Sequence, residues 1–284
     1  MSTKKATPYG FLKLLAHEQR WNLLVALSGS DLRVHELMAR VGEPANLVSY
    51  HLRRLREHAL VRERRSSADA RDVYYSLDLD RVAYLYQAAG ASLHPGLVHD
   101  SGGPLRSAAP GVAPGGAPAP APRRRVLFVC THNSARSQMA EALLRAQSGG
   151  RIEAASAGTS PTALHPLAIQ VLAQQGIDIR EQRAKSLAEV GATGWDRLVT
   201  VCDLAREACP ALPEGVEAQH WSVPDPAAVE GSEEARLAAF EAIARDLRTR
   251  TRFLVAALAA QPAAAALAAP AAPAAVDALE SPPR

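Results

Sequence analysis

The feature that most constrains this chain is a short apolar run that leads into a loop containing a cysteine. Residues 125–129 (RVLFV) are predicted to form a buried strand, and the loop 130–137 (CTHNSARS) follows directly. A helical pattern, QMAEALLRA, comes next at 138–146. A strand, a tight loop and a helix N-terminus form an anion site, because loop amides point inward and the helix dipole favours negative charge. We therefore expect an α/β domain here, with a parallel sheet and a phosphate-binding loop.

Cys130 at the start of this loop is the expected nucleophile. The loop amides, the helix dipole and Arg136 are all expected to lower its pKa, so that a thiolate forms at neutral pH. The planar guanidinium of Arg136 can fold back and bind a tetrahedral oxyanion. The remaining loop residues would surround the same anion: Thr131, His132, Asn133, Ser134, Ala135 and Ser137.

A loop of this kind serves two reactions, dephosphorylation through a cysteinyl phosphate and reduction of arsenate. Both require an acid that protonates the leaving oxygen. Asp225 is the candidate, because Pro224 and Pro226 stiffen the loop that carries it. A tyrosine phosphatase would usually have an aromatic residue beside this acid to stack on the substrate ring, but Ala227 and Ala228 follow Asp225-Pro226.

The cysteines separate the two reactions. The chain has three, and none of them precedes position 130. Cys202 follows the apolar run 198–201, and Cys209 comes seven residues later, in CDLAREAC. If 203–208 is helical, these two cysteines lie about 10.5 Å apart along the helix axis, so a disulfide between them requires the helix to unwind. Cys202 and Cys209 together with Cys130 favour a thiol relay, and hence reduction.

Segments rich in proline, glycine and alanine divide the chain. We expect a flexible linker at 93–123 and a disordered tail at 261–284. Two folded domains remain, residues 1–92 and 124–260, and we expect no rigid connection between them. The net charge of +3 does not mark the whole chain as a nucleic-acid binder, so any basic patch must be local.

The first domain has the pattern of a mainly α winged helix-turn-helix. Helical periodicity covers 17–28 and 33–41, and Gly42-Glu43-Pro44 then breaks the chain before a helix that is expected to begin at Asn46 as its N-cap. Residues 61–64 and 73–77 can pair as the strands of a wing, with 66–69 at its tip. An excess of arginine on this helix and wing predicts contacts with DNA phosphates. The expected DNA-binding residues are Asn46, Ser49, Tyr50, His51, Arg53, Arg54, Arg62, Arg64 and Arg65.

Residues 10–90 resemble the ArsR-type winged helix-turn-helix repressors, on the residues SYHL at 49–52 within PANLVSYHLRRLREHALV. The resemblance implies binding to duplex DNA, and we expect a homodimer formed through this domain. Family members often sense arsenite or metals through thiolates or His/Asp pairs. This domain has no cysteine and no obvious pair of ligating histidines, so we expect no metal site.

Residues 124–258 resemble the thioredoxin-coupled arsenate reductases, which share the low-molecular-weight tyrosine phosphatase fold. The matching segments are VLFVCTHNSARSQMAEALL, SAGTSPTALHPLAIQVLAQQGIDI, LVTVCDLAREACPALP and HWSVPDPA. The resemblance implies arsenate as substrate, thioredoxin or another thiol as electron donor, and no bound cofactor. It also implies roles for seven residues: Cys130 as nucleophile, Arg136 as oxyanion ligand, Asn133 and Ser137 as organisers of the loop, Asp225 as acid, and Cys202 and Cys209 as relay.

Several positions depart from this family's pattern. Many members have Gly at the position of His132 and Cys at that of Ala135, and His132 is expected to crowd the loop or alter the nucleophile's pKa. Some relatives bind a potassium ion near the loop, and Glu141 and Ser156 match part of that site. Lys185 falls where an acidic ligand would be, so its ammonium is expected to replace the ion.

These patterns predict an arsenate reductase fused to a DNA-binding regulator, acting in arsenic detoxification. No signal peptide and no membrane span is apparent, so we expect a cytoplasmic protein with reduced thiols. Two alternatives stay open. One is a low-molecular-weight tyrosine phosphatase fused to a regulator, and the other is a DNA-binding oxyanion sensor without turnover.

Overall fold

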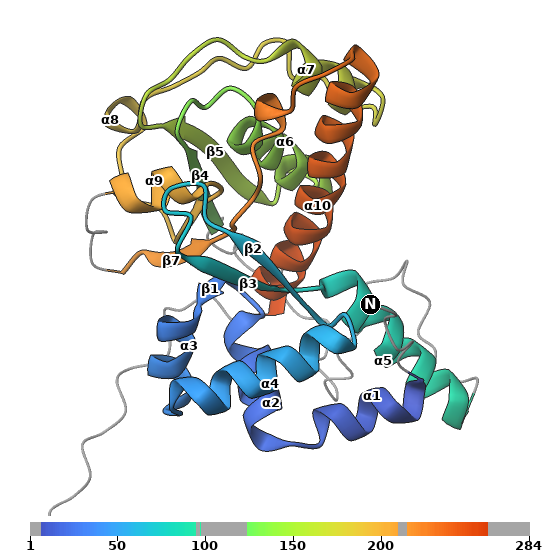
Figure 1. Ribbon diagram of the computed structural model, residues 1–284. Helices are drawn as coiled ribbons and strands as arrows, with labels where there is room; N and C mark the ends of the chain where they lie inside the picture. The colour runs from blue at the N-terminus through green and yellow to red at the C-terminus, as the bar shows by residue number, and fades with distance from the viewer. Residues whose placement is uncertain (1–6, 95–96, 98–123, 210–214, 261–284) are drawn as a thin grey trace, which may run out of the picture.

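The computed structural model describes residues 7–94, 97, 124–209 and 215–260. The predicted linker at 93–123, apart from residues 93, 94 and 97, and the predicted tail at 261–284 lie outside the described residues. The described residues form two hydrophobic cores, one from residues within 11–89 and the other from residues within 126–258. Figure 1 shows the corresponding N-terminal domain below and C-terminal domain above.

The N-terminal domain places helices around a small antiparallel sheet with the strand order β1–β3–β2. Its elements are α1 (Pro8–Leu15), α2 (Glu18–Leu27), β1 (Leu32–Arg33), α3 (Val34–Val41), α4 (Ala45–Glu57), β2 (Val61–Arg65), β3 (Val73–Leu77) and α5 (Leu79–Leu93). The predicted helix-turn-helix is α3 and α4, and the predicted wing is the β2–β3 hairpin. We call residues 61–77 the wing from here on.

Local chemistry explains the turn between α3 and α4. Gly42 ends α3 in the left-handed region, at φ 71°, where a residue without Cβ is favoured. Pro44 is the N-cap of α4, and the helix begins at Ala45. The expectation that Asn46 caps α4 is therefore wrong by two positions. The fixed φ of Pro44 already suits the entry to a helix, and Asn46 lies within the first turn.

The C-terminal domain is built on a parallel sheet with the strand order β5–β4–β6–β7. Its elements are β4 (Arg124–Cys130), α6 (Arg136–Ser148), β5 (Ile152–Gly158), α7 (Pro166–Ala173), α8 (Leu187–Val190), β6 (Arg197–Thr200), α9 (Asp203–Ala208), β7 (Glu217–His220), the 3-10 turn η2 (Pro226–Ala228) and α10 (Glu233–Ala260). This confirms the predicted α/β class.

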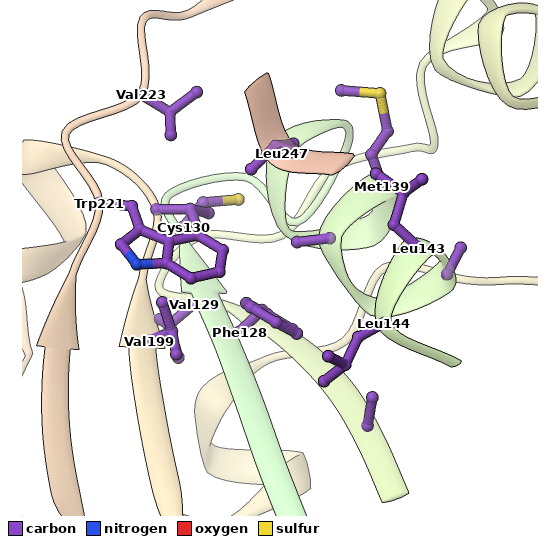
Figure 2. Close-up of a cluster of buried hydrophobic side chains, with 14 of the residues drawn as sticks. Phe128, Val129, Cys130, Met139, Leu143, Leu144, Val199, Trp221, Val223 and Leu247 are labelled. Atoms are coloured by element: carbon purple, nitrogen blue, oxygen red, sulfur yellow. The ribbon is translucent and has the colours of Figure 1, made fainter. Parts of the chain in front are cut away.

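The core of this domain supports the end of β4. Residues 126–129 are all 0% exposed, as expected for a parallel strand covered on both faces. Figure 2 shows Phe128 and Val129 below Cys130, with Trp221 beside the cysteine and Met139 of α6 across from it. None of the helices in the described ranges is long and apolar enough to cross a membrane.

The two domains are in direct contact, which corrects the expectation that only a flexible linker connects them. The backbone N–H of Asp31 donates to the carbonyl of His220 at 2.7 Å, and the Asp31 carboxylate accepts from the Ser222 N–H at 2.7 Å. Arg250 of α10 pairs with the same carboxylate at 3.0 Å. In Figure 1 the β2–β3 hairpin extends toward α9. These contacts join residues that are between about 190 and 219 positions apart, which local sequence patterns do not reveal.

Candidate active site

Cys130 is the last residue of β4 and is 2% exposed. Its Sγ lies 2.9 Å from Ser137 Oγ and accepts from the Asn133 N–H at 3.1 Å. The loop therefore curls around the sulfur, because it must connect β4 to α6 over only a few residues. The predicted strand, loop and helix are all present at this position.

Asn133 holds the loop in this shape. Its φ of 46° lies in the left-handed region, which asparagine tolerates better than most residues. The side chain donates to Ser137 Oγ and to Ser156 Oγ, each at 2.9 Å. Its Oδ1 accepts from the Lys185 backbone N–H at 2.7 Å. These bonds tie the loop to β5 and to the segment before α8, and they support the expected role of Asn133 as an organiser.

Gly158 is a residue of the site that the sequence reasoning did not single out. It ends β5 opposite Cys130, and a Cβ added there would lie 2.8 Å from the Thr131 carbonyl oxygen and 3.0 Å from Asn133 Cβ. The loop can pack on β5 only because this side chain is absent. An isolated glycine in a strand can signal such a close approach, but no strand was predicted over residues 152–158.

Arg136 and Asp225 meet over this loop. Arg136 Nη2 donates to Asp225 Oδ2 at 2.9 Å, and Nη1 donates to the Val223 carbonyl at 3.2 Å. Arg136 is 6% exposed, whereas the side chain of Asp225 is 34% exposed. The Ala227 N–H holds the other carboxylate oxygen at 3.1 Å. The structure thus brings together two residues that are 89 positions apart and were predicted to act on the same anion.

The expectation of a lowered pKa for Cys130 is wrong in this structure. Burial raises the pKa of the Cys130 thiol above its ordinary value and outweighs the hydrogen bond from Ser137, while proximity to Cys202 adds to the rise. The charge of Arg136 opposes the shift, but its guanidinium is paired with Asp225. The sequence of the loop does not show how far other segments of the chain bury Cys130. The effect of this burial on its pKa could therefore not be predicted from the loop alone.

The two other cysteines flank α9. Cys202 is 1% exposed and is the N-cap of the helix, where its Sγ accepts from the Ala205 N–H at 3.4 Å. The same sulfur lies 3.4 Å from Thr131 Oγ1 of the anion loop. Cys209 is the half-buried C-cap, and burial raises its pKa. All three thiols are free, and residues 203–208 between the relay cysteines are helical, which was the condition for the separation expected between these cysteines.

The remaining predicted features of the loop region are also placed. Lys185 Nζ lies 3.6 Å from Glu141 Oε2, and Arg145 pairs with the same 2%-exposed carboxylate at 2.7 Å. His132 is exposed, so its side chain does not crowd the loop. Among the described residues there is no group of three or more His, Cys, Asp or Glu side chains placed to hold a metal ion.

Five of the six DNA-binding residues predicted on α4 are exposed: Asn46, Ser49, Tyr50, Arg53 and Arg54. His51 is the exception and corrects the prediction, because it is 2% exposed and its ring centroid lies 4.5 Å from that of His17. His51 shares the inward face of the helix with Val48, Leu52 and Leu55. This spacing follows the helical repeat, so His51 packs in the core of the domain.

Two of the three predicted wing arginines contact the C-terminal domain. Arg64 donates to the Ser222 carbonyl at 2.9 Å and pairs with Asp203. Arg62 pairs with Asp246 of α10 at 3.2 Å, and Arg65 stays exposed. The expectation that all three arginines face DNA phosphates does not hold for Arg64 in this arrangement, since its donors are engaged between the domains.

Two family models match separate parts of the chain. Residues 17–63 match the bacterial regulatory proteins of the arsR family, and residues 125–264 match the low-molecular-weight phosphotyrosine protein phosphatases. The matches coincide with the helix-turn-helix and with the domain that carries Cys130.

Curated relatives of the second part are arsenate reductases. The enzyme from Bacillus licheniformis is 34% identical over 130 residues, which are 46% of this chain and 94% of that protein. The enzyme from Bacillus subtilis is 34% identical over 127 residues, covering 45% of this chain and 91% of that protein. Among solved structures, a thioredoxin-dependent arsenate reductase from Corynebacterium glutamicum is 30% identical and covers 44% of this chain and 60% of that one, with a TM-score of 0.36.

Proposed function

The chain belongs to the arsenate reductases of the low-molecular-weight phosphatase family through its C-terminal domain, and on this premise we propose that it reduces arsenate to arsenite while its arsR-type domain binds DNA. One observation supports the reduction most strongly. A buried cysteine in an anion loop lies beside a second buried cysteine, with Thr131 Oγ1 3.4 Å from the Cys202 sulfur. Hydrolysis of a phosphate ester needs no second thiol there.

The proposed reaction begins at Cys130. Its thiolate attacks arsenic while Arg136 and the loop amides bind the oxyanion, and Asp225 protonates the departing oxygen, which leaves as water. Ser137 Oγ lies 2.9 Å from the Cys130 sulfur, and the backbone N–H of Asn133 donates to it at 3.1 Å. Both hydrogen bonds favour the thiolate form of Cys130. Arg136 and Asp225 already face each other at 2.9 Å, so an anion bound by one lies within reach of the other.

The relay then removes the product. Cys202 attacks the Cys130 sulfur, the sulfur–arsenic bond breaks, and arsenite leaves with the electron pair. Cys209 attacks Cys202 in turn, which frees Cys130 and leaves a Cys202–Cys209 disulfide. One arsenate and two thiols thus give one arsenite, one disulfide and one water. Cys209 is less buried than the other two cysteines, which supports thioredoxin, or another thiol, as the donor that reduces the final disulfide.

Steady-state assays with arsenate and thioredoxin, run beside hydrolysis of an aryl phosphate, test this function. We expect thioredoxin-dependent arsenite formation that Cys130→Ser abolishes. We expect little aryl phosphatase activity, because Ala227 and Ala228 follow the acid and no aromatic side chain from these positions can stack on the substrate ring. Aryl phosphate hydrolysis without arsenite formation would instead establish the phosphatase alternative, and DNA binding without either activity would leave a sensor.

The DNA-binding role includes a proposed homodimer. Large apolar side chains stay exposed on α1 and α5, among them Tyr9 at 75%, Tyr86 at 70% and Leu93 at 73%. An apolar face of this kind on paired helices suits contact with a second copy. We further propose that the protein works in the cytoplasm in arsenic detoxification, where reducing conditions keep the three thiols ready for the reaction.

A further inference from the structure

A buried carboxylate joins the two domains at Asp203, the residue directly after Cys202. It is 0% exposed. Its Oδ1 accepts from Ser222 Oγ at 2.7 Å and faces His220 Nε2 at 3.2 Å, both within its own domain. Its Oδ2 accepts from the N–H and Oγ of Ser67, at 2.7 Å and 2.9 Å, and from Arg64. One oxygen of this carboxylate is therefore bonded entirely by the wing.

These bonds decide the charge state of Asp203. Burial alone would raise the pKa of the carboxyl, but hydrogen bonds from His220, Ser67, Ser222 and Arg64 outweigh it and hold the pKa below its ordinary value. A buried carboxylate that loses such partners is strongly unfavourable. The wing and Asp203 therefore stay together as long as α9 keeps its present shape.

The N-terminal domain also contacts the second turn of α9. Arg206 Nη1 donates to the Asp31 carbonyl at 3.3 Å, and the guanidinium pairs with Glu36 of α3. The same group lies 5.3 Å from the ring centroid of Tyr74 in β3. Asp203 and Arg206 are thus two anchors on α9, and both lie between the relay cysteines.

The relay step requires this helix to change. Cys202 and Cys209 cap α9 at its two ends, about 10.5 Å apart along the axis at 1.5 Å per residue. A disulfide needs Cα atoms within about 6.8 Å of each other. When the Cys209 thiolate attacks Cys202, the Cys130–Cys202 bond breaks and its electron pair returns to Cys130. The exchange is redox-neutral, but the new bond unwinds the segment that carries Asp203 and Arg206.

We propose that Asp203 and DNA compete for the wing: reduced α9 holds Arg64 and Ser67 away from DNA, and the Cys202–Cys209 disulfide releases them. The coupling rests on the proposed function, because it uses its DNA-binding role and its relay. The side chain of Arg64 is a typical phosphate ligand, and it cannot bind a phosphate while it bonds Asp203 and Ser222. Because linkage is reciprocal, bound DNA favours disulfide formation by the same factor.

The experiment uses the full chain, reduced with a dithiol or oxidised with a small disulfide reagent, so that it does not depend on arsenate turnover. Mass spectrometry verifies the Cys202–Cys209 bond. Hydrogen exchange at the Ser67 amide reports docking of the wing, and fluorescence anisotropy with a labelled duplex from upstream of the gene reports DNA affinity. Three variants are compared with the native chain. Asp203→Asn replaces the carboxylate with an uncharged amide of the same shape, and Asp178→Asn is the same change at an exposed position. Cys209→Ser cannot form the Cys202–Cys209 disulfide.

Oxidation of the native chain is expected to speed exchange at Ser67 and to tighten DNA binding by about tenfold, within the usual range of coupling between sites. Reduced Asp203→Asn should behave like the oxidised native chain. Asp178→Asn should match the native chain in both states. Cys209→Ser, in which the oxidant can form only a Cys130–Cys202 disulfide, should keep the Ser67 exchange rate and the DNA affinity of the reduced chain.

The proposal would be overturned if the native chain, with a verified Cys202–Cys209 disulfide, showed the same Ser67 exchange and the same DNA affinity as the reduced chain. This comparison uses only the native chain, so it does not depend on whether a variant folds. Faster exchange with equal DNA affinity in the two states would overturn the competition alone. If neither state binds DNA, the DNA-binding function fails together with the competition. If no arsenite forms in the separate activity assay, the reductase function fails while the coupling, measured with the disulfide reagent, still stands.

Discussion

Among the described residues, the guanidinium of Arg136 bonds two groups, and both belong to the segment that carries Asp225. The guanidinium bonds the Val223 carbonyl at 3.2 Å and the Asp225 carboxylate at 2.9 Å. This pairing keeps the positive charge compensated in a site that is almost fully buried. At the scale of single residues, the chemistry therefore depends on two side chains that exchange their present bonds for bonds to an oxyanion.

Asp225→Asn should slow the chemical step by about 10²–10⁴-fold, because general acid catalysis typically contributes that much. The amide keeps the shape and can still accept from Arg136, so the loop should stay in place. The measurement is the single-turnover rate of arsenite formation, with Asp178→Asn as an exposed control. An unchanged single-turnover rate would remove Asp225 from the mechanism.

The Cys130 thiol should ionise above its ordinary pKa of 9.0, because burial disfavours the thiolate. In a Cys202→Ser/Cys209→Ser background, the ultraviolet absorption of the thiolate should still be rising above pH 9. Ser137→Ala should move the titration further up, since its hydrogen bond at 2.9 Å lowers the pKa. Ser232→Ala, outside the site, serves as the control.

A plateau of thiolate absorption near neutral pH in the free protein would contradict this prediction. It would show that the loop amides and Arg136 together outweigh burial.

At the scale of elements, α9 carries two functions in a helix of six residues. Its ends hold the relay cysteines, and the side chains of Asp203 and Arg206 contact the N-terminal domain. A helix this short is stabilised mainly by tertiary contacts. It can therefore unwind for the disulfide at modest cost, provided that those contacts are given up at the same time.

Cys209→Ser should allow about one turnover per enzyme and then stop with a Cys130–Cys202 disulfide. Cys202 still resolves the arsenic adduct in this variant, but no thiol remains to move the disulfide outward. Arsenite formed per enzyme and peptide mapping of the trapped bond are the measurements, and the native chain is the control. Full steady-state activity of the variant with thioredoxin as sole reductant would refute the relay.

At the scale of the whole molecule, the two domains form one packed assembly through α9, β7 and α10. Asp31 illustrates this, because it is 3% exposed and is bonded by Ser222 and Arg250 of the other domain. Apart from the buried His51, the recognition helix α4 exposes its predicted DNA-facing side chains to solvent, whereas Arg64 on the wing is held by the C-terminal domain. DNA binding by this chain is thus expected to depend on both domains.

In the full chain, Arg54→Ala should weaken DNA binding and reduce the slope of log affinity against log salt by about 0.9, the value for one phosphate contact. Arg54 is exposed on α4. Arg180→Ala, in an exposed pair with Asp178 remote from this helix, is the control and should leave the slope unchanged. A native slope in Arg54→Ala would exclude this arginine from the interface with DNA.

The sequence by itself determined the features that are local. The anion loop needs Cys130, Arg136 and the strand and helix around them within a few residues, and the turn before α4 needs Gly42 and Pro44 two positions apart. The loop and the position of the turn were predicted correctly, although the N-cap of α4 is Pro44 and not Asn46, because backbone geometry acts over one or two turns.

The tertiary structure decided everything that depends on desolvation or on partners far along the chain. His51 is buried, the pKa of Cys130 is raised, and Arg64 bonds a carboxylate 139 residues away. The sequence around Arg64 does not indicate that this arginine pairs with a distant carboxylate, because local residues do not encode which part of the chain will pack on the wing. Burial and long-range charge pairing are properties of the packed molecule. They join helix α9, which lies between the relay cysteines, to the wing.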